Sequence, residues 1–105
     1  MRREIVLAPE ALKAFRHLPA HDRSEVRDAL ERHLRFEPTK VSRSRIKRLR
    51  GVSRPQHCLR VGDIRVFYDV TETTVEVLAI IAKAQAQAWL EREGTPDAGG
   101  GPRKG

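Results

Sequence analysis

The chain has 105 residues, which is enough for one small domain with a single hydrophobic core. It carries 21 Lys and Arg against 14 Asp and Glu, a net charge of +7, and this balance favours an anionic partner. Its one cysteine, Cys58, excludes an internal disulfide and fits a reducing cytoplasm, and its longest apolar run, residues 77–82, is too short to cross a membrane.

The N-terminal part has the pattern of a strand followed by two helices. Residues 4–7 form a short β-like run, and Pro9 suits the first turn of a helix, where its missing N–H is no loss. Apolar residues at helical spacing continue until Pro19, which ends this helix. A capping box that begins at Asp22 predicts a second helix over residues 22–36. We expect these helices to form an antiparallel hairpin.

The C-terminal part has the pattern of three strands and a last helix. Residues 56–61, 64–70 and 74–83 are rich in β-branched and aromatic residues, and Gly62-Asp63 between the first two runs is typical of a tight hairpin turn. Residues 85–93 then predict a short helix. The segment between the helical hairpin and these strands is polar and basic, and we expect it to lead into the sheet.

The expected fold is therefore α+β, in the order β-α-α-β-β-β-α. An antiparallel sheet packs one face on the helical hairpin and leaves its other face partly open. This domain would span residues 1–94. Residues 95–105 are rich in Gly and Pro, so we expect a disordered tail there.

Positive charge is concentrated in one segment, because residues 40–65 include nine basic residues and a single acid, Asp63. Within it, Arg65 stands between Ile64 and Val66, so strand alternation places its side chain on the face opposite to theirs. The planar fork of an arginine can bind two phosphate oxygens there. The alternative is an ion pair with an acid across the sheet, such as Glu76. The nearby cations that we expect to contact backbone phosphates of a nucleic acid, rather than only solvent, are Lys47, Arg48, Arg50 and Arg60.

Two further side chains are candidates for proton transfer. His57 is the only side chain in the expected strands that titrates near pH 7, although alternation also allows it a structural place on the helix side of the sheet. Lys83, at the end of the third run, can supply a proton or a charge, or simply be solvated. The sequence has no metal-ligand pattern and no glycine-rich phosphate loop, so we expect no metal and no cofactor.

The element order and several segments together resemble the RelE/ParE superfamily of type II toxin–antitoxin toxins. The resemblance covers about residues 3–93, and the short helical hairpin is more similar to the RelE branch than to the gyrase-targeting ParE branch. The matching segments are Ala8-Pro9-Glu10-Ala11-Leu12, the helix end at Phe15 to Leu18-Pro19, Lys47-Arg48-Leu49-Arg50-Gly51, residues 59–69, and Ile80-Ile81-Ala82-Lys83.

This resemblance implies a small cytoplasmic toxin that a cognate antitoxin wraps and neutralises. In the RelE branch such a toxin enters the ribosomal A site and cuts mRNA. Arg65 matches the arginine of the family's Gly-Asp-Ile-Arg segment, and its implied role is to stabilise the scissile phosphate. The best-known members have two basic residues nine and seven positions earlier, where this chain has Gln56 and Cys58. The basic residue expected after the last strand falls at Ala84, next to Lys83.

The first hypothesis is therefore a metal-independent mRNA endoribonuclease whose partners are the ribosome, mRNA and an antitoxin. The alternative is a member of the same fold that acts by binding alone, either as a catalytically silent toxin or on DNA gyrase. The residues Gln56 and Cys58 at usually basic positions favour this alternative.

Overall fold

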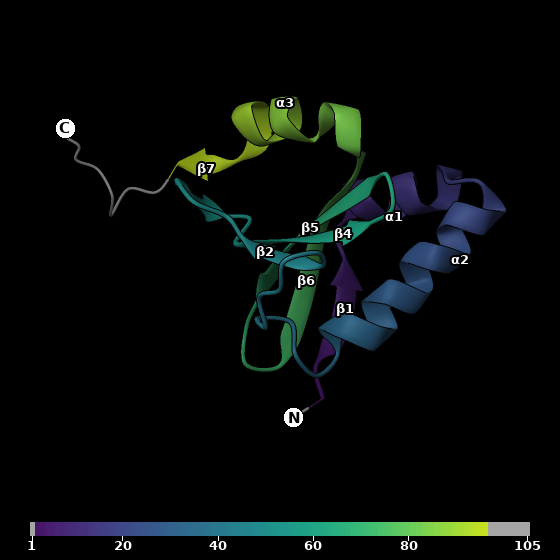
Figure 1. The fold of residues 1–105 in the computed structure, drawn as a ribbon, viewed down its shortest axis with the longest axis horizontal. Helices are drawn as coiled ribbons and strands as arrows, with labels where there is room; N and C mark the ends of the chain where they lie inside the picture. Colours follow the sequence, from purple (N-terminus) through teal and green to yellow (C-terminus); the bar gives the residue numbers. More distant parts are fainter. Residues whose placement is uncertain (1, 97–105) are drawn as a thin grey trace.

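The main sheet has five strands in the order β1-β6-β5-β4-β2 (Figure 1). The computed structural model describes residues 2–96. The pairs β6-β5, β5-β4 and β4-β2 are antiparallel, whereas β1 pairs with β6 in parallel, so the expected antiparallel sheet is a mixed one. The strands of this sheet are β1 (Glu4–Leu7), β2 (Ile46–Arg48), β4 (His57–Val61), β5 (Ile64–Val70) and β6 (Thr74–Ala82).

Two short strands form a second, antiparallel sheet from β3 (Val52–Arg54) and β7 (Thr95–Pro96). Thr95 and Pro96, the first two residues of the expected tail, form β7 and pair with β3. The rest of the expected disordered tail, residues 97–105, lies outside the described residues. Within residues 2–96, no helix is long and apolar enough to cross a membrane.

The helices are α1 (Pro9–His17), α2 (Ala20–Ala29) with a π-helical continuation η1 (Leu30–Leu34), and α3 (Lys83–Glu93). The α1 helix begins at Pro9, as predicted. The prediction of Asp22 as the N-cap of the second helix was wrong: Pro19 is the N-cap, and its carbonyl oxygen accepts a hydrogen bond from Arg23 N at 2.9 Å. Asp22 lies in the first turn instead, where its carboxylate complements the helix dipole.

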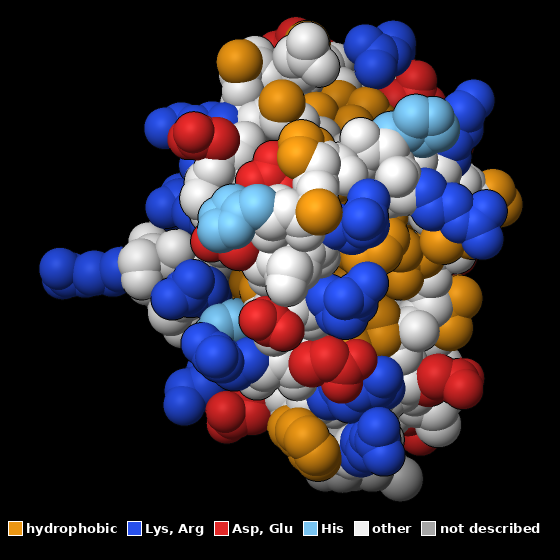
Figure 2. Space-filling view, turned by 90° about the vertical axis from the view of Figure 1, so that its right-hand side faces the viewer, with side chains coloured by type: hydrophobic (Ala, Val, Ile, Leu, Met, Phe, Trp, Pro, Cys, Tyr) orange, Lys and Arg blue, Asp and Glu red, His pale blue; other side chains and the backbone are white. Residues whose placement is uncertain are grey.

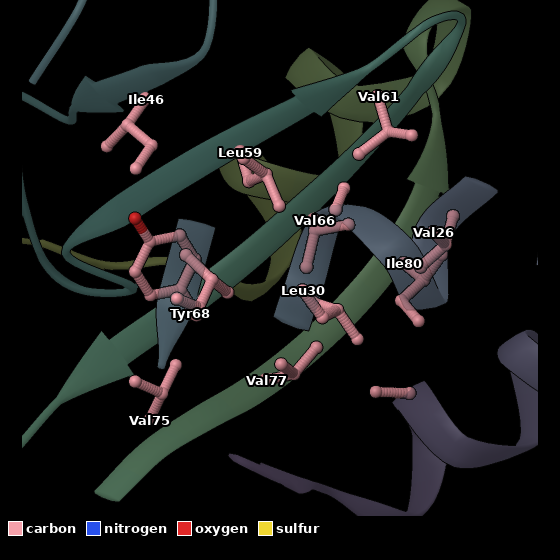
Figure 3. Packing of buried hydrophobic residues seen from close by; sticks show 13 residues of the cluster. Val26, Leu30, Ile46, Leu59, Val61, Val66, Tyr68, Val75, Val77 and Ile80 are labelled. Carbon is pink, nitrogen blue, oxygen red and sulfur yellow. The ribbon is translucent and has the colours of Figure 1, made fainter. Parts of the chain in front are cut away.

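The helical hairpin and one face of the sheet enclose the main core (Figure 3). Val66 and Tyr68 of β5 point toward this core, and Val26 and Leu30 pack against the sheet from the helix side. Tyr68 also satisfies its buried hydroxyl by donating to the carbonyl oxygen of Pro38 at 2.6 Å. This packing fixes the direction of every second side chain along the strands.

The α3 helix lies on the opposite side of the sheet (Figure 1). Its Trp89 packs with Cys58, Phe67 and Ala79, and the Trp89 and Phe67 rings are stacked with centroids 4.9 Å apart. The face that we expected to be partly open is therefore covered over its middle. What stays accessible is the end of the sheet beside the β4–β5 turn and the edge strand β2.

Candidate nucleic-acid interface

The β4–β5 turn fixes the position of Arg65. Val61 pairs with Ile64, so Gly62 and Asp63 form a two-residue hairpin turn, and the φ of +58° at Gly62 meets the requirement of a type II′ turn. The resulting register places Arg60 directly opposite Arg65. The backbone N–H of Lys83 donates to the carbonyl oxygen of Asp63 at 2.7 Å, so the start of α3 is attached to the same turn.

Three cations surround Cys58 on the α3 side of the sheet. Cys58 pairs with Lys47 of β2 and with Phe67 of β5. Burial raises the pKa of the Cys58 thiol to about 11, and the positive charges of Arg65, Arg60 and Lys47 act in the opposite direction. These three side chains therefore share one surface, which we call the cationic face (Lys47, Arg60 and Arg65).

The Arg65 guanidinium is held by backbone and not by an acid. Its Nη1 donates to the carbonyl oxygens of Gly62 at 2.8 Å and Ile64 at 3.1 Å. The alternative pair with Glu76 does not form, because Glu76 accepts from Arg54 Nη2 at 3.1 Å. Among residues 2–96, no carboxylate lies within ion-pair distance of Arg65, and its Nε and Nη2 donate to no protein group, so they can bind an added anion.

The remaining predicted RNA contacts divide into two groups. Arg50 joins Lys47 in lining a pocket of about 300 Å³ against Gln87 and Leu90 of α3. Arg48 is separated from them, because the register pairs it with His57 and its Nη1 donates to the carbonyl oxygen of Gln56 at 3.0 Å. Four of the predicted phosphate contacts, those of Lys47, Arg50, Arg60 and Arg65, thus lie on one side of the sheet.

His57 lies on the other side of the sheet from Arg65. Its ring is 5% exposed and stacks on Tyr68 with centroids 5.4 Å apart, and its Nδ1 is buried without a hydrogen-bond partner. Burial lowers the pKa of His57, Arg48 lowers it further, and Asp69 opposes both. A buried neutral imidazole in this place supports the core and cannot reach a phosphate bound by Arg65.

The two positions that are basic in the best-known family members have structural partners here. The side-chain oxygen of Gln56 accepts from the backbone N–H of Val70 at 3.2 Å, and the backbone N–H of Gln56 donates to Asp69 at 2.7 Å. Cys58 is buried, and its raised pKa keeps the thiol protonated at neutral pH. Neither side chain supplies charge or an exchangeable proton near pH 7.

Within the part of the chain that the structure describes, one group of side chains has the geometry to hold a metal ion. The ligand atoms of His21, Asp22 and Glu25 lie within 4.8 Å of one another at the start of α2. His21 and Glu25 are exposed and already within 3.5 Å of each other. The group lies on the helical hairpin, on the other side of the sheet from the cationic face, so it takes no part in that site.

The surface around α2 has mixed charge. In Figure 2, which turns this side toward the viewer, Lys and Arg side chains alternate with Asp and Glu, and apolar groups show between them. Several of these charges form exposed pairs along the helix, such as Arg35 with Glu31 and His21 with Glu25. Among residues 2–96, the cations of the cationic face have no such partners, which makes that face the better anion-binding surface.

Comparisons with known proteins identify the fold. No family model and no curated protein sequence matches the chain. Among solved structures, the free toxin RelE of E. coli, in a mutant form, matches with a TM-score of 0.62 and 24% identity over 87% of this chain and 93% of that one. The archaeal RelE–RelB complex from Pyrococcus horikoshii gives 0.60 and 24% over 81% and 99%, and YoeB from Staphylococcus aureus gives 0.59 and 14% over 75% and 94%. The chain therefore has the fold of the RelE toxins, as its segments predicted.

Proposed function

We propose that this protein is the toxin of a type II toxin–antitoxin pair and that it cuts mRNA on the ribosome. The observation that carries the proposal is the cationic face: in a RelE fold, Lys47, Arg60 and Arg65 gather at one end of the sheet without acidic partners among the described residues. A surface of this kind binds phosphates without reading bases.

The proposed reaction is a phosphoryl transfer within the RNA strand, from the 5′-oxygen to the neighbouring 2′-oxygen. A 2′-oxygen attacks the adjacent phosphorus, its proton is removed, the bond to the 5′-oxygen breaks, and that oxygen takes up a proton. The products are a 2′,3′-cyclic phosphate and a free 5′-hydroxyl. Negative charge gathers on the non-bridging oxygens in the transition state, and fixed cationic donors stabilise it.

Arg65 is the residue that we assign to this charge. Its Nη1 is anchored to the turn, so its Nε and Nη2 are presented in a fixed orientation, and preorganised donors of this type need no rearrangement during the reaction. Lys83 lies beyond the same turn and is exposed, so we assign it to the leaving oxygen or to a neighbouring phosphate. Lys47, Arg50 and Arg60 would hold the flanking phosphates.

The cognate antitoxin is the second proposed partner. The solved RelE structures from Pyrococcus horikoshii and Methanococcus jannaschii are complexes with RelB. By extension, we propose that an acidic segment of an antitoxin covers the cationic face of this protein and excludes RNA from it. Such a protein works in the cytoplasm, where its ribosomal target is found.

A binding-only toxin is the alternative, and one observation favours it. Gln56 and Cys58 are tied into the sheet as uncharged groups at positions where the best-known family members carry basic residues. In that case the cationic face would grip RNA, or a target such as DNA gyrase, without breaking a bond.

The test uses purified protein, programmed ribosomes and end-labelled mRNA, with Arg65→Ala and the matched control Arg16→Ala. Arg16 is an exposed cation of α1, so its loss changes the net charge equally without touching the cationic face. We expect wild type and Arg16→Ala to cut in the A site, and Arg65→Ala to be slower by about 10²–10³-fold, the usual effect of removing one transition-state donor. Equal cutting by Arg65→Ala would remove Arg65 from the mechanism. A wild type that leaves mRNA intact but inhibits translation or DNA supercoiling would favour the binding-only alternative.

A further inference from the structure

A second pocket with basic walls lies between η1 and the loop that leads into β2. Its volume is about 310 Å³, and Ile46, which forms part of its wall, belongs to the core under the helical hairpin. The pocket is therefore separate from the pocket that Lys47 and Arg50 line against α3. We call it the η1 pocket, and the polar side chains that face it are Arg32, His33, Glu37, Lys40, Ser42, Ser44 and Arg45.

The loop that forms one wall of the η1 pocket is organised by Ser42. The Ser42 hydroxyl oxygen accepts from the backbone N–H groups of Arg45 at 3.1 Å and Ile46 at 3.3 Å, and the Ser42 N–H donates to the carbonyl oxygen of Ile46 at 2.9 Å. These three bonds close the loop where it enters β2. The backbone of Arg45 is thereby fixed before any ligand arrives.

The pocket carries positive charge that the described part of the protein does not neutralise. Its only carboxylate, that of Glu37, lies 3.7 Å from Lys40. The guanidinium groups of Arg32 and Arg45 have no hydrogen bond and no ion pair within residues 2–96. Burial is the largest cause of the lowered pKa of the half-buried His33, and the charges of Arg45 and Arg32 lower that pKa further. The electric fields of the two arginines therefore overlap in the pocket.

We propose that the η1 pocket is a second phosphate-binding site, which takes a backbone phosphate of folded RNA on the far side of the edge strand β2. The proposal rests on the RNA-binding part of the function proposed above, but not on cleavage. Arg32 and Arg45 would bind the phosphate oxygens from opposite walls, because one belongs to η1 and the other to the loop.

The chemistry of the pocket favours RNA over an acidic peptide. Ile46 is its only apolar wall residue and is 4% exposed, whereas protein partners are anchored by apolar and aromatic side chains in such hollows. The pocket is also linked to the cationic face. Arg60 donates from its backbone N–H to the carbonyl oxygen of Arg45 at 2.8 Å and from Nη1 to that of Arg43 at 3.3 Å. One folded RNA can therefore contact both sides of the β2 edge.

The test measures binding of a fluorescein-labelled RNA hairpin to the full chain by anisotropy, over salt concentrations from about 50 to 200 mM. The pocket variant is Arg32→Gln/Arg45→Gln. The matched control is Lys13→Gln/Arg16→Gln, which removes two exposed cations of α1 outside the pocket. Circular dichroism confirms that each variant is folded. The measured quantity is the slope of log K against log salt.

The slope is negative, and we expect its magnitude to be smaller by about 0.7–0.9 in the pocket variant, which corresponds to the loss of one phosphate contact. The control should change the slope much less. Multiplied by the logarithm of the salt concentration, this change in slope predicts about a sixfold loss of affinity at 0.1 M salt, because fewer counterions are released on binding. A slope equal to that of the control would overturn the proposal. It would also be overturned if the pocket variant lost affinity for a polyglutamate peptide but not for RNA.

Cleavage assays separate this proposal from the proposed function. If wild type shows the pocket-dependent slope but cuts no mRNA, the second site stands and the nuclease mechanism fails. If wild type cuts mRNA while the pocket variant and its control bind RNA alike, the nuclease mechanism stands and the second site fails.

Discussion

Replacing Trp89 with alanine should remove the main attachment of α3 to the sheet. Trp89 is 8% exposed and stacks on Phe67, and it also covers Cys58 and Ala79. Truncating a buried tryptophan to alanine costs about 3–5 kcal/mol, because transfer energy is lost and a cavity is left. The stacked ring pair accounts for about 0.5–1.5 kcal/mol of this. Since small domains are stable by about 5–15 kcal/mol, Trp89→Ala should lose a large part of the total.

The assay is urea unfolding followed by far-UV circular dichroism, with Trp89→Phe and Leu12→Ala alongside. Trp89→Phe keeps an aromatic ring on Phe67 and should lose less than half as much stability. Leu12 is 36% exposed on α1, so its truncation should change the free energy of unfolding by about 0.5 kcal/mol or less. Trp89 is the only tryptophan of the chain, so the fluorescence of wild type reports directly on the docking of α3.

Two results would refute this reasoning. If Trp89→Ala costs about 1 kcal/mol or less, α3 is not held on the sheet by this ring. If the fluorescence of wild type changes at much lower urea than the circular dichroism, α3 leaves the sheet before the domain unfolds. Coincident transitions are expected, because Phe67, the partner of Trp89, is itself fully buried in β5.

The remaining predictions concern buried polar groups and the pH dependence of cleavage. His57 has a lowered pKa, so on acidification the unfolded chain binds the proton first, and below about pH 6.5 this residue should lower stability by at most about 1.4 kcal/mol per pH unit, in addition to the loss from His33, whose pKa is also lowered. His57→Phe should remove the His57 part of this slope and His17→Gln should not. Tyr68→Phe leaves the buried carbonyl of Pro38 without its donor and should cost about 1–3 kcal/mol in urea unfolding, whereas no loss would mean that water replaces the hydroxyl. Cys58 is buried with a thiol pKa of about 11, so roughly one thiol in a thousand is ionised at pH 8, and iodoacetamide should react far faster in urea than with the folded protein. Cleavage on the ribosome should accelerate by about tenfold per pH unit without a plateau near neutrality, and a bell-shaped profile centred near pH 7 would contradict the roles assigned to Arg65 and Lys83.

The sequence was sufficient to predict the elements whose apolar pattern is long. The strands β5 and β6 and the start of α1 follow from alternation and from Pro9, and Gly62-Asp63 predicted the turn that places Arg60 opposite Arg65. These features depend on local chemistry, so tertiary packing did not change them.

The edge of the sheet was not predictable in the same way. The strand β2 has only three residues, and two of them, Lys47 and Arg48, are charged. Only Ile46 faces the core, so no periodicity marks a strand. Without the strand there is no alternation, and therefore the separation of Arg48 from Lys47 could not be inferred. It is the pairing with β4 that makes these three residues a strand and places Lys47 and Arg48 on opposite faces of the sheet.

The covering of the second face by α3 had a signal that was available in the sequence. Because Val66 faces the helical hairpin, Phe67 has to face the other way, and a phenylalanine with Cys58 beside it needs an apolar cover. The last helix has two large apolar residues that could provide this cover, Trp89 and Leu90. The prediction of a partly open face considered only the helical hairpin as a cover and overlooked this pair.

The predicted rise of cleavage with pH follows from what the cationic face contains. Fixed cations stabilise the transition state, but a 2′-hydroxyl must also lose a proton, and a general base contributes about 10²–10⁴-fold to such a step. None of the four histidines belongs to the cationic face: His33 and His57 lie on the helical-hairpin side of the sheet, and His17 and His21 lie on α1 and α2. The thiol of Cys58 stays protonated at neutral pH. Lys83 and the arginines are cations and cannot accept the proton. Among the described residues, the cationic face thus stabilises charge but contains no neutral-pH base, so hydroxide has to remove the proton, and the rate should increase with pH as long as this proton removal limits cleavage.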